Sequence, residues 1–189
     1  IQFKVWDTQT GTLRASLEGH RGDVVDASFS LDGRSIVSAS WGSPVRVWDA
    51  QTGTLRASLK GHTALVQAAS FSPDGRAIVT ASRDETAKVW DAHTGALRAT
   101  LEGHTANVLA ASFSPDGRSI VTAGSDGTAK VWDAHTGALR ATLQTNTDGV
   151  RIASFSPNGS TIVVAGSGGM AQVWDAQTGA LRAPLAGHT

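Results

Sequence analysis

Short apolar runs alternate with compact turn sequences along the chain, and the same arrangement recurs every 42 residues. In one unit, an apolar run at 66–71 precedes the turn Pro73-Asp-Gly75, and a second apolar run at 77–81 follows it. Runs of this length with turn residues between them predict β-strands, and Pro-Asp-Gly is a strong hairpin signal. Two more strands follow, one ending near Trp90 and one at 97–101. We therefore expect four short strands and no helix in each unit.

The outermost predicted strand of a unit is amphipathic. At 12–17, Leu13, Ala15 and Leu17 alternate with polar residues, as in a strand with one solvated face. The first strand behaves differently, because Val66 and Phe71 are an odd five residues apart. If both point into one core, a β-bulge must lie between them.

Two dipeptides mark the period. Trp-Asp stands at 6–7, 48–49, 90–91, 132–133 and 174–175, and Gly-His stands at 19–20, 61–62, 103–104 and 187–188, with Thr145-Asn146 in the remaining slot. A fixed period of about forty residues indicates one supersecondary unit copied in a row. The predicted division is a half unit at 1–20, then units at 21–62, 63–104, 105–146 and 147–189.

Composition narrows the classes of function. Sixteen Lys and Arg balance sixteen Asp and Glu, so neither a nucleic acid nor a membrane is an expected partner. The absence of cysteine removes disulfides and zinc–thiolate sites. No apolar run has the length of a membrane span, and we expect a cytoplasmic protein. The chain begins at Ile1 inside a unit, which suggests a trimmed chain or part of a longer one.

No catalytic or metal constellation is visible. His93 and His135 lie in equivalent turns 42 residues apart, where they do not converge as metal ligands must. Asp91 and Asp133 are explained as turn formers. No nucleophile–base pattern or phosphate-binding glycine loop occurs. We expect no enzyme activity, no cofactor and no bound metal.

The order Gly-His, Ser-Pro-Asp-Gly, Ser-Asp-Gly-Thr and Val-Trp-Asp, at this period, resembles the WD-repeat β-propeller family along the whole chain. The resemblance implies an all-β fold of four-stranded antiparallel blades packed around a central channel. This chain would supply four whole blades and an N-terminal half blade, which holds only a third and a fourth strand.

The resemblance also implies a structural hydrogen-bond network inside each blade, made by a His, a Ser or Thr, an Asp and the Trp. It is complete twice in this sequence, in one blade as His62, Thr80, Asp84 and Trp90, and in the next as His104, Thr122, Asp126 and Trp132. The first whole blade has Gly42 in the Asp position. The last keeps only Trp174, with Asn146, Val164 and Gly168 in the other positions. We therefore predict that the two middle blades are the most rigid and the last the least.

Internal comparison of two units points to a binding surface. Residues 61–102 and 103–144 differ at seven positions, and three of these (65/107, 67/109 and 83/125) fall where the family has the upper rim of the propeller. Drift of exposed positions is the alternative explanation. Carried over residue by residue, the rim comprises Asp23, Val25, Trp41, Leu65, Gln67, Arg83, Asn107, Leu109, Ser125, Gly149, Arg151 and Ser167.

Trp41 is the only Trp outside the 42-residue series. An exposed Trp with apolar and Arg neighbours suits an interaction hot spot. Alternatively, Trp41 caps the blade edge and fills the space left by the missing Asp.

Four blades are too few for a typical ring of this family, and open blade faces leave apolar patches. We expect completion by further blades or by a second copy, which would give an eight-bladed homo-oligomeric ring. The half blade would be completed by strands upstream of Ile1 or would dock irregularly. Two functions remain: a scaffold whose rim binds a protein or peptide, and a structural segment whose main property is self-assembly.

Overall fold

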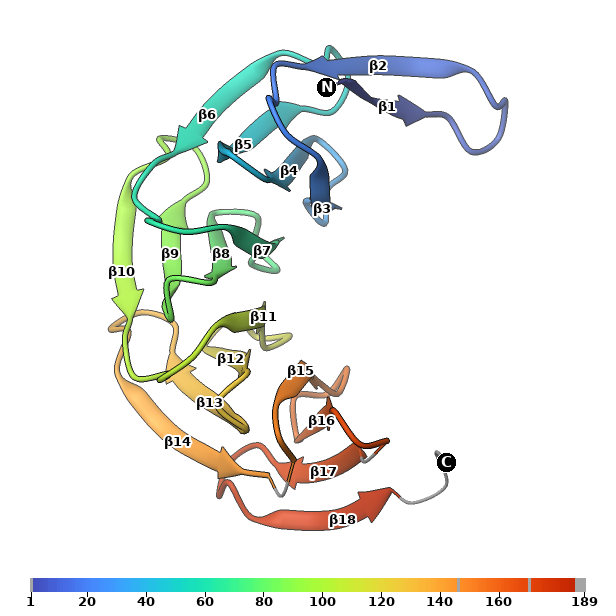
Figure 1. Cartoon of the computed structure of the whole chain (residues 1–189). Helices are drawn as coiled ribbons and strands as arrows, with labels where there is room; N and C mark the ends of the chain where they lie inside the picture. Colours follow the sequence, from blue (N-terminus) through green and yellow to red (C-terminus); the bar gives the residue numbers. More distant parts are fainter. Residues whose placement is uncertain (1, 146, 170, 186–189) are drawn as a thin grey trace.

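Strands and turns account for the regular structure of the chain. The computed structural model describes residues 2–145, 147–169 and 171–185, and these contain no helix, hence none that could span a membrane. Four four-stranded antiparallel sheets follow one another along an open arc, and a two-stranded sheet lies at its N-terminal end (Figure 1). The predicted all-β fold of blades is confirmed. Asn146 and the last Gly-His pair, 187–188, lie outside the described residues.

Each four-stranded sheet takes four consecutive strands in chain order, and the two-stranded sheet pairs the first two. The strands are β1 (Gln2–Trp6) and β2 (Leu13–Glu18); β3 (Val24–Phe29), β4 (Ser35–Ser40), β5 (Ser43–Asp49) and β6 (Leu55–Leu59); β7 (Val66–Phe71), β8 (Ala77–Ser82), β9 (Ala87–Asp91) and β10 (Leu97–Leu101); β11 (Val108–Phe113), β12 (Ser119–Gly124), β13 (Thr128–Asp133) and β14 (Leu139–Gln144); β15 (Val150–Phe155), β16 (Thr161–Gly166), β17 (Ala171–Asp175) and β18 (Leu181–Leu185).

The first strand of every four-stranded sheet faces the centre of the arc, and the fourth lies on its outer side (Figure 1). The register of the first strand shifts between Val66 and Ala68, and at the equivalent place in the other three sheets. The predicted bulge is therefore confirmed. It lets Val66 and Phe71 contact the same apolar cluster although they are an odd number of residues apart.

Neighbouring sheets pack face to face through equivalent clusters. In one of them, Val47 and Leu59 from the first whole sheet contact Ile78 and Trp90 from the second whole sheet. Two further clusters repeat this contact along the chain. The inner strands are also joined, because the Ser28 hydroxyl donates to the carbonyl oxygen of Ala69 at 3.2 Å. Each sheet therefore buries its apolar faces against its neighbours, as in a repeat array.

The half blade packs against the first whole sheet through the contacts that whole sheets use among themselves, which argues against the alternative of irregular docking. Ala15 and Leu17 pack against Ile36 and Trp48 of the first whole sheet. A Cβ on Gly53 would lie 3.3 Å from Ala15, just as a Cβ on Gly95 one repeat later would lie 3.3 Å from Ala57. The half blade is thus in the position that the outer half of a preceding blade would have.

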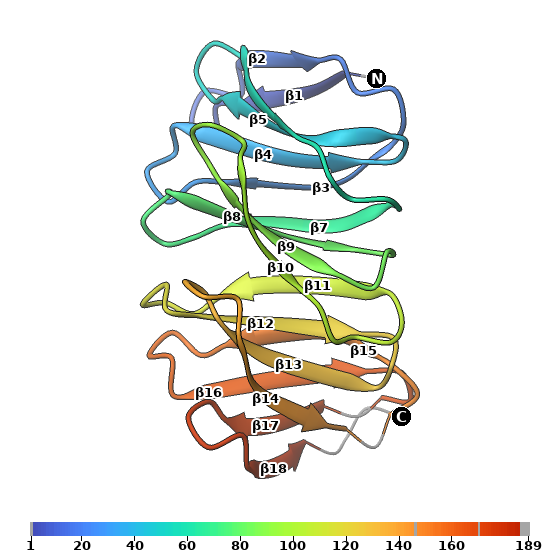
Figure 2. The same cartoon turned by 90° about the vertical axis from the view of Figure 1, so that its left-hand side faces the viewer.

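Because neighbouring strands in each sheet run in opposite directions, the connections between them lie alternately at the two edges of the arc. Turns between first and second strands, and between third and fourth strands, share one edge. Turns between second and third strands share the other edge with the links from one sheet to the next. Figure 2, which views the arc from its outer side, shows the strands crossing it and the turns gathered along both edges. We call the edge with the links between sheets the rim edge.

Candidate binding rim

Two of the three rim residues predicted in each blade lie side by side at the rim edge. The backbone N–H of Trp41 donates to the carbonyl oxygen of Asp23 at 3.0 Å, and Arg83 donates to Leu65 at 2.9 Å. The same bond joins Ser125 to Asn107 at 2.9 Å and Ser167 to Gly149 at 3.0 Å. One backbone frame therefore presents a different pair of side chains in each of the four blades.

The third predicted rim residue of each blade is the bulged residue of the first strand. These residues are Val25, Gln67, Leu109 and Arg151. A bulge re-aims its side chain relative to the regular pleat, and bulges are frequent beside functional sites. The frame thus holds three positions at a fixed spacing, whatever residues occupy them.

The blades do not expose these positions equally. Asp23, Val25 and Trp41 are all exposed in the first whole blade, whereas Leu65 and Gln67 are half-buried. Asn107, Leu109 and Ser125 are half-buried as well. In the last whole blade Arg151 is exposed, whereas Gly149 is buried and, being a glycine, has no side chain to offer a partner.

Arg83 is exposed but held in place. With its amide oxygen turned toward Arg83, Gln67 accepts hydrogen bonds from Nη2 at 3.0 Å and from Nε of the guanidinium. No carboxylate pairs with Arg83 among the ion pairs of residues 2–145, 147–169 and 171–185. Its charge is therefore oriented and available to an anionic group.

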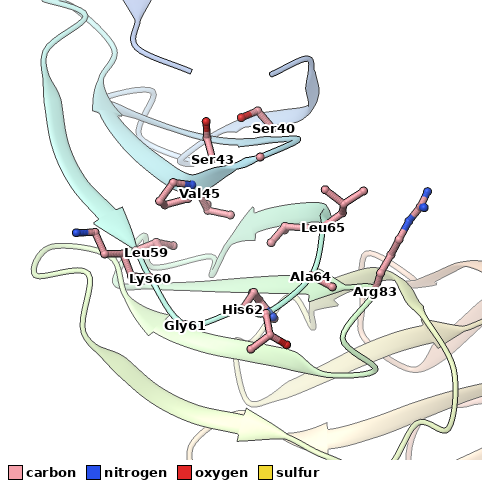
Figure 3. Close-up of a pocket in the computed structure, with 14 residues that line it drawn as sticks. Ser40, Ser43, Val45, Leu59, Lys60, Gly61, His62, Ala64, Leu65 and Arg83 are labelled. Atoms are coloured by element: carbon pink, nitrogen blue, oxygen red, sulfur yellow. The ribbon is translucent and has the colours of Figure 1, made fainter. Parts of the chain in front are cut away.

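A groove opens at the rim edge between the first and second whole sheets (Figure 3). Its volume is about 500 Å³, in the range of ligand pockets. Val45, Leu59 and Leu65 supply apolar lining, and Lys60 and Arg83 lie at its two ends. We call this the interblade groove. Leu65 and Arg83 could be predicted from the family's rim positions. Val45, Leu59 and Lys60 could not, because they belong to strands and links outside that rim.

The structure joins both predicted middle-blade networks by hydrogen bonds. His62 Nδ1 lies 2.7 Å from Asp84 Oδ2, its Nε2 lies 2.7 Å from the Thr80 hydroxyl, and Trp90 Nε1 donates to that hydroxyl at 2.8 Å. In the next blade the corresponding distances are 2.8, 2.7 and 2.9 Å, among His104, Asp126, Thr122 and Trp132. Each network is closed, and each buried polar group in it has a partner.

Burial sets the protonation of these histidines. It lowers the pKa of His104, while the nearby Asp126 carboxylate opposes the shift without cancelling it. The neutral imidazole then donates from Nδ1 to the carboxylate and accepts at Nε2. Burial also disfavours the charged form of Asp84, but hydrogen bonds from Thr86, His62 and the Thr63 N–H hold the pKa of that carboxyl at about 2.

The first whole blade completes its network in a different way. His20 Nε2 lies 2.6 Å from the Ser38 hydroxyl, which accepts from Trp48 Nε1 at 2.8 Å. With Gly42 in the Asp position, His20 Nδ1 lies 2.7 Å from the Ser40 hydroxyl. Ser40, which the sequence analysis did not consider, thus makes the hydrogen bond of the missing Asp, while the Trp41 side chain stays exposed.

The last whole blade lacks this network within the described residues. Trp174 Nε1 is buried without a hydrogen-bond partner, and the Thr position holds buried Val164. A buried, unpaired indole N–H lowers stability. The blade order of rigidity stays a prediction, and this unpaired donor supports the low rank given to the last blade.

Comparison with known proteins agrees with this architecture. Residues 11–49, 53–91, 95–133 and 137–175 match the family model described as WD domain, G-beta repeat. Each matched segment contains the outer strand of one sheet and the first three strands of the next, so successive repeats interlock. No curated protein matches the chain.

Proposed function

Because the chain belongs to the family of the WD domain, G-beta repeat, we propose that it is a scaffold that binds a protein or peptide through its rim residues. Proteins with these repeats generally mediate protein–protein interactions and are generally not enzymes. The proposal for this chain adds the surface, which is the rim edge of the arc.

One observation carries the proposal. The same hydrogen-bonded frame recurs in all four whole blades and presents unlike residues, from Asp23 and Trp41 in one to Leu65 and Arg83 in the next. A conserved framework with varied, partly exposed side chains is suited to recognition of a particular partner. Trp and Arg are also the residues most enriched at energetic hot spots of protein interfaces.

Selection of peptide ligands tests the proposal. Twelve-residue peptides selected from a random library on the intact chain are expected to bind the double variant Trp41→Ala/Arg83→Ala at least tenfold more weakly, since each side chain removed is a hot-spot type. Affinities are measured by fluorescence anisotropy.

Variants at the opposite edge are the matched control. His93 and His135 are exposed in the turns between third and fourth strands, so His93→Ala/His135→Ala is expected to leave peptide affinity unchanged. Selected peptides that bind the Trp41/Arg83 variant as tightly as the parent chain would refute the rim as the binding surface.

Self-association is a second candidate function, and the two ends of the arc favour it. Leu185 on the last sheet is 44% exposed, whereas its equivalent Leu143 is fully buried against the next sheet. At the other end Trp6 is 54% exposed, while the equivalent Trp48 is 1% exposed. These are the faces that adjoining sheets cover elsewhere in the arc.

Under this second candidate, two copies meet end to end and complete an eight-bladed ring. The mass in solution would then be twice the 19.5 kDa of one chain, measured by light scattering on a size-exclusion column. The two-stranded sheet covers part of the first whole sheet, so a second copy arriving there would contact β1 and β2. A monomer at all tested concentrations would refute self-association.

A further inference from the structure

We infer that the interblade groove binds an acidic peptide segment, with an apolar side chain on Pro44 and Leu65 and carboxylates directed to Lys60 and Arg83. This inference rests on the proposed rim function and assigns the ligand chemistry of one place on it. The sign of the lining charges, the apolar walls and the restriction of both features to a single junction support it.

The lining carries positive charge and no carboxylate. Lys60 and Arg83 are both exposed, and no Asp or Glu of residues 2–145, 147–169 and 171–185 lines the groove. His62 also lines it, but burial lowers its pKa, which keeps the ring neutral at neutral pH. Asp84, in the turn that carries Arg83, is bound to His62 and to the Thr63 N–H. An anionic ligand therefore meets complementary charge at both ends of the groove.

Apolar walls lie between the two cations. Val45 and Leu59 of the first whole sheet are only 1% and 3% exposed. The accessible apolar surface of the lining comes from Pro44, which is exposed, and from Leu65 on the link to the second sheet (Figure 3). Leu65 is half-buried and faces the groove, which leaves part of its surface for a ligand. Cations around an apolar center favour a peptide over a small inorganic anion, because an anion would leave the exposed surface of Pro44 and Leu65 uncovered.

The equivalent positions at the next junctions lack this combination. Lys60 and Arg83 correspond to Glu102 and Ser125, and one repeat later to Gln144 and Ser167. Leu65 likewise corresponds to Asn107 and then to Gly149. Cationic ends with a leucine wall thus belong to one junction, although residues 61–102 and 103–144 differ at only seven positions.

Chemical-shift titration with defined peptides tests the inference. The probes carry one leucine flanked on each side by a glutamate, at spacings of one to three serines, and matched probes replace both glutamates by glutamine or the leucine by alanine. The best glutamate probe is expected to bind about tenfold more tightly than its glutamine counterpart. Its shifts should concentrate at the backbone amides of 60–66 and 83.

Residues found one repeat later in this chain provide substitutions that the blade is expected to tolerate. Lys60→Glu and Arg83→Ser install residues that stand at the equivalent place one repeat later, and each is expected to weaken binding about three- to tenfold. In the converse variant, Glu85→Ser removes the carboxylate that stands in place of the lining residue Ser43. Together with Glu102→Lys, Asn107→Leu and Ser125→Arg it is expected to create a second site, with new shifts at 102–108.

Three results would overturn the inference: equal affinity for the glutamate and glutamine probes, shifts outside the groove, or no second site in the converse variant. The proposed function is judged separately. If the acidic probes fail while library-selected peptides still require Trp41, rim binding stands and the groove assignment falls. If no selected peptide depends on the rim, the rim function itself falls.

Discussion

Replacement of Thr122 by valine is expected to lower the free energy of unfolding by about 2–4 kcal/mol, although the two side chains have nearly the same shape. Thr122 is fully buried, and its hydroxyl lies 2.7 Å from His104 Nε2 and accepts from Trp132 Nε1 at 2.9 Å. Valine would leave both groups unpaired in a buried site. Urea denaturation measures the change, with an unaltered slope showing that the unfolding transition is the same.

The last whole blade offers the reverse experiment. Val164 occupies the position equivalent to Thr122, and Trp174 Nε1 is unpaired. Val164→Thr is therefore expected to raise the free energy of unfolding by about 1 kcal/mol, since it supplies the missing acceptor. Val163→Thr is the matched control, because Val163 is exposed on the neighbouring strand position, and it should change stability little. A loss in Val164→Thr equal to that in Thr122→Val would show that the indole needs no acceptor.

Much of the fold could be predicted because a 42-residue period leaves few alternatives. Once the Trp-Asp spacing shows that the unit is copied, strand count, turn positions and the bulge between Val66 and Phe71 follow from one unit and hold for all. The four residues of each complete network could likewise be assigned from the family pattern. In the structure the His and Asp of each complete network lie within hydrogen-bond distance of each other.

Ser40 shows where the family pattern was insufficient. With Gly42 in the Asp position the family pattern predicts a reduced network, but Ser38 and Ser40 are two apart on one strand and so point to the same face. That signal was present in the sequence. In the third whole sheet the same position is Gly124, where a Cβ would lie 2.4 Å from His104 Nδ1. In the second whole sheet Ser82 holds this position beside an intact Asp84–His62 pair and accepts from the Asp84 N–H at 3.2 Å. The serine therefore bonds the His only in the blade that lacks the Asp.

The interblade groove could not be predicted from one unit. Its walls come from β5, β6 and the link that precedes β7, so they meet only when two sheets pack at a definite distance and angle. A repeat pattern reports which residues vary, and it identified Leu65 and Arg83. It does not report that Val45 and Lys60 of the preceding unit face them across the junction.

Leu143→Ala is expected to lower the free energy of unfolding by about 2–5 kcal/mol, whereas Leu185→Ala should cost less than about 0.5 kcal/mol in a single chain. Both leucines occupy the same place in the repeat. Leu143 is fully buried in the cluster between the last two sheets, and Leu185 is 44% exposed on the open face. The comparison, again by urea denaturation, holds the substitution and its place in the repeat constant and varies what covers the side chain.

The dependence on protein concentration then separates the two candidate functions of the arc. If a second copy covers the last sheet, Leu185→Ala destabilises the associated form, and its cost grows with concentration as association becomes favourable. If the chain acts alone through its rim, the cost stays small at every concentration. A large cost that does not vary with concentration would contradict the open position of Leu185 itself, because only a contact within the chain could produce it.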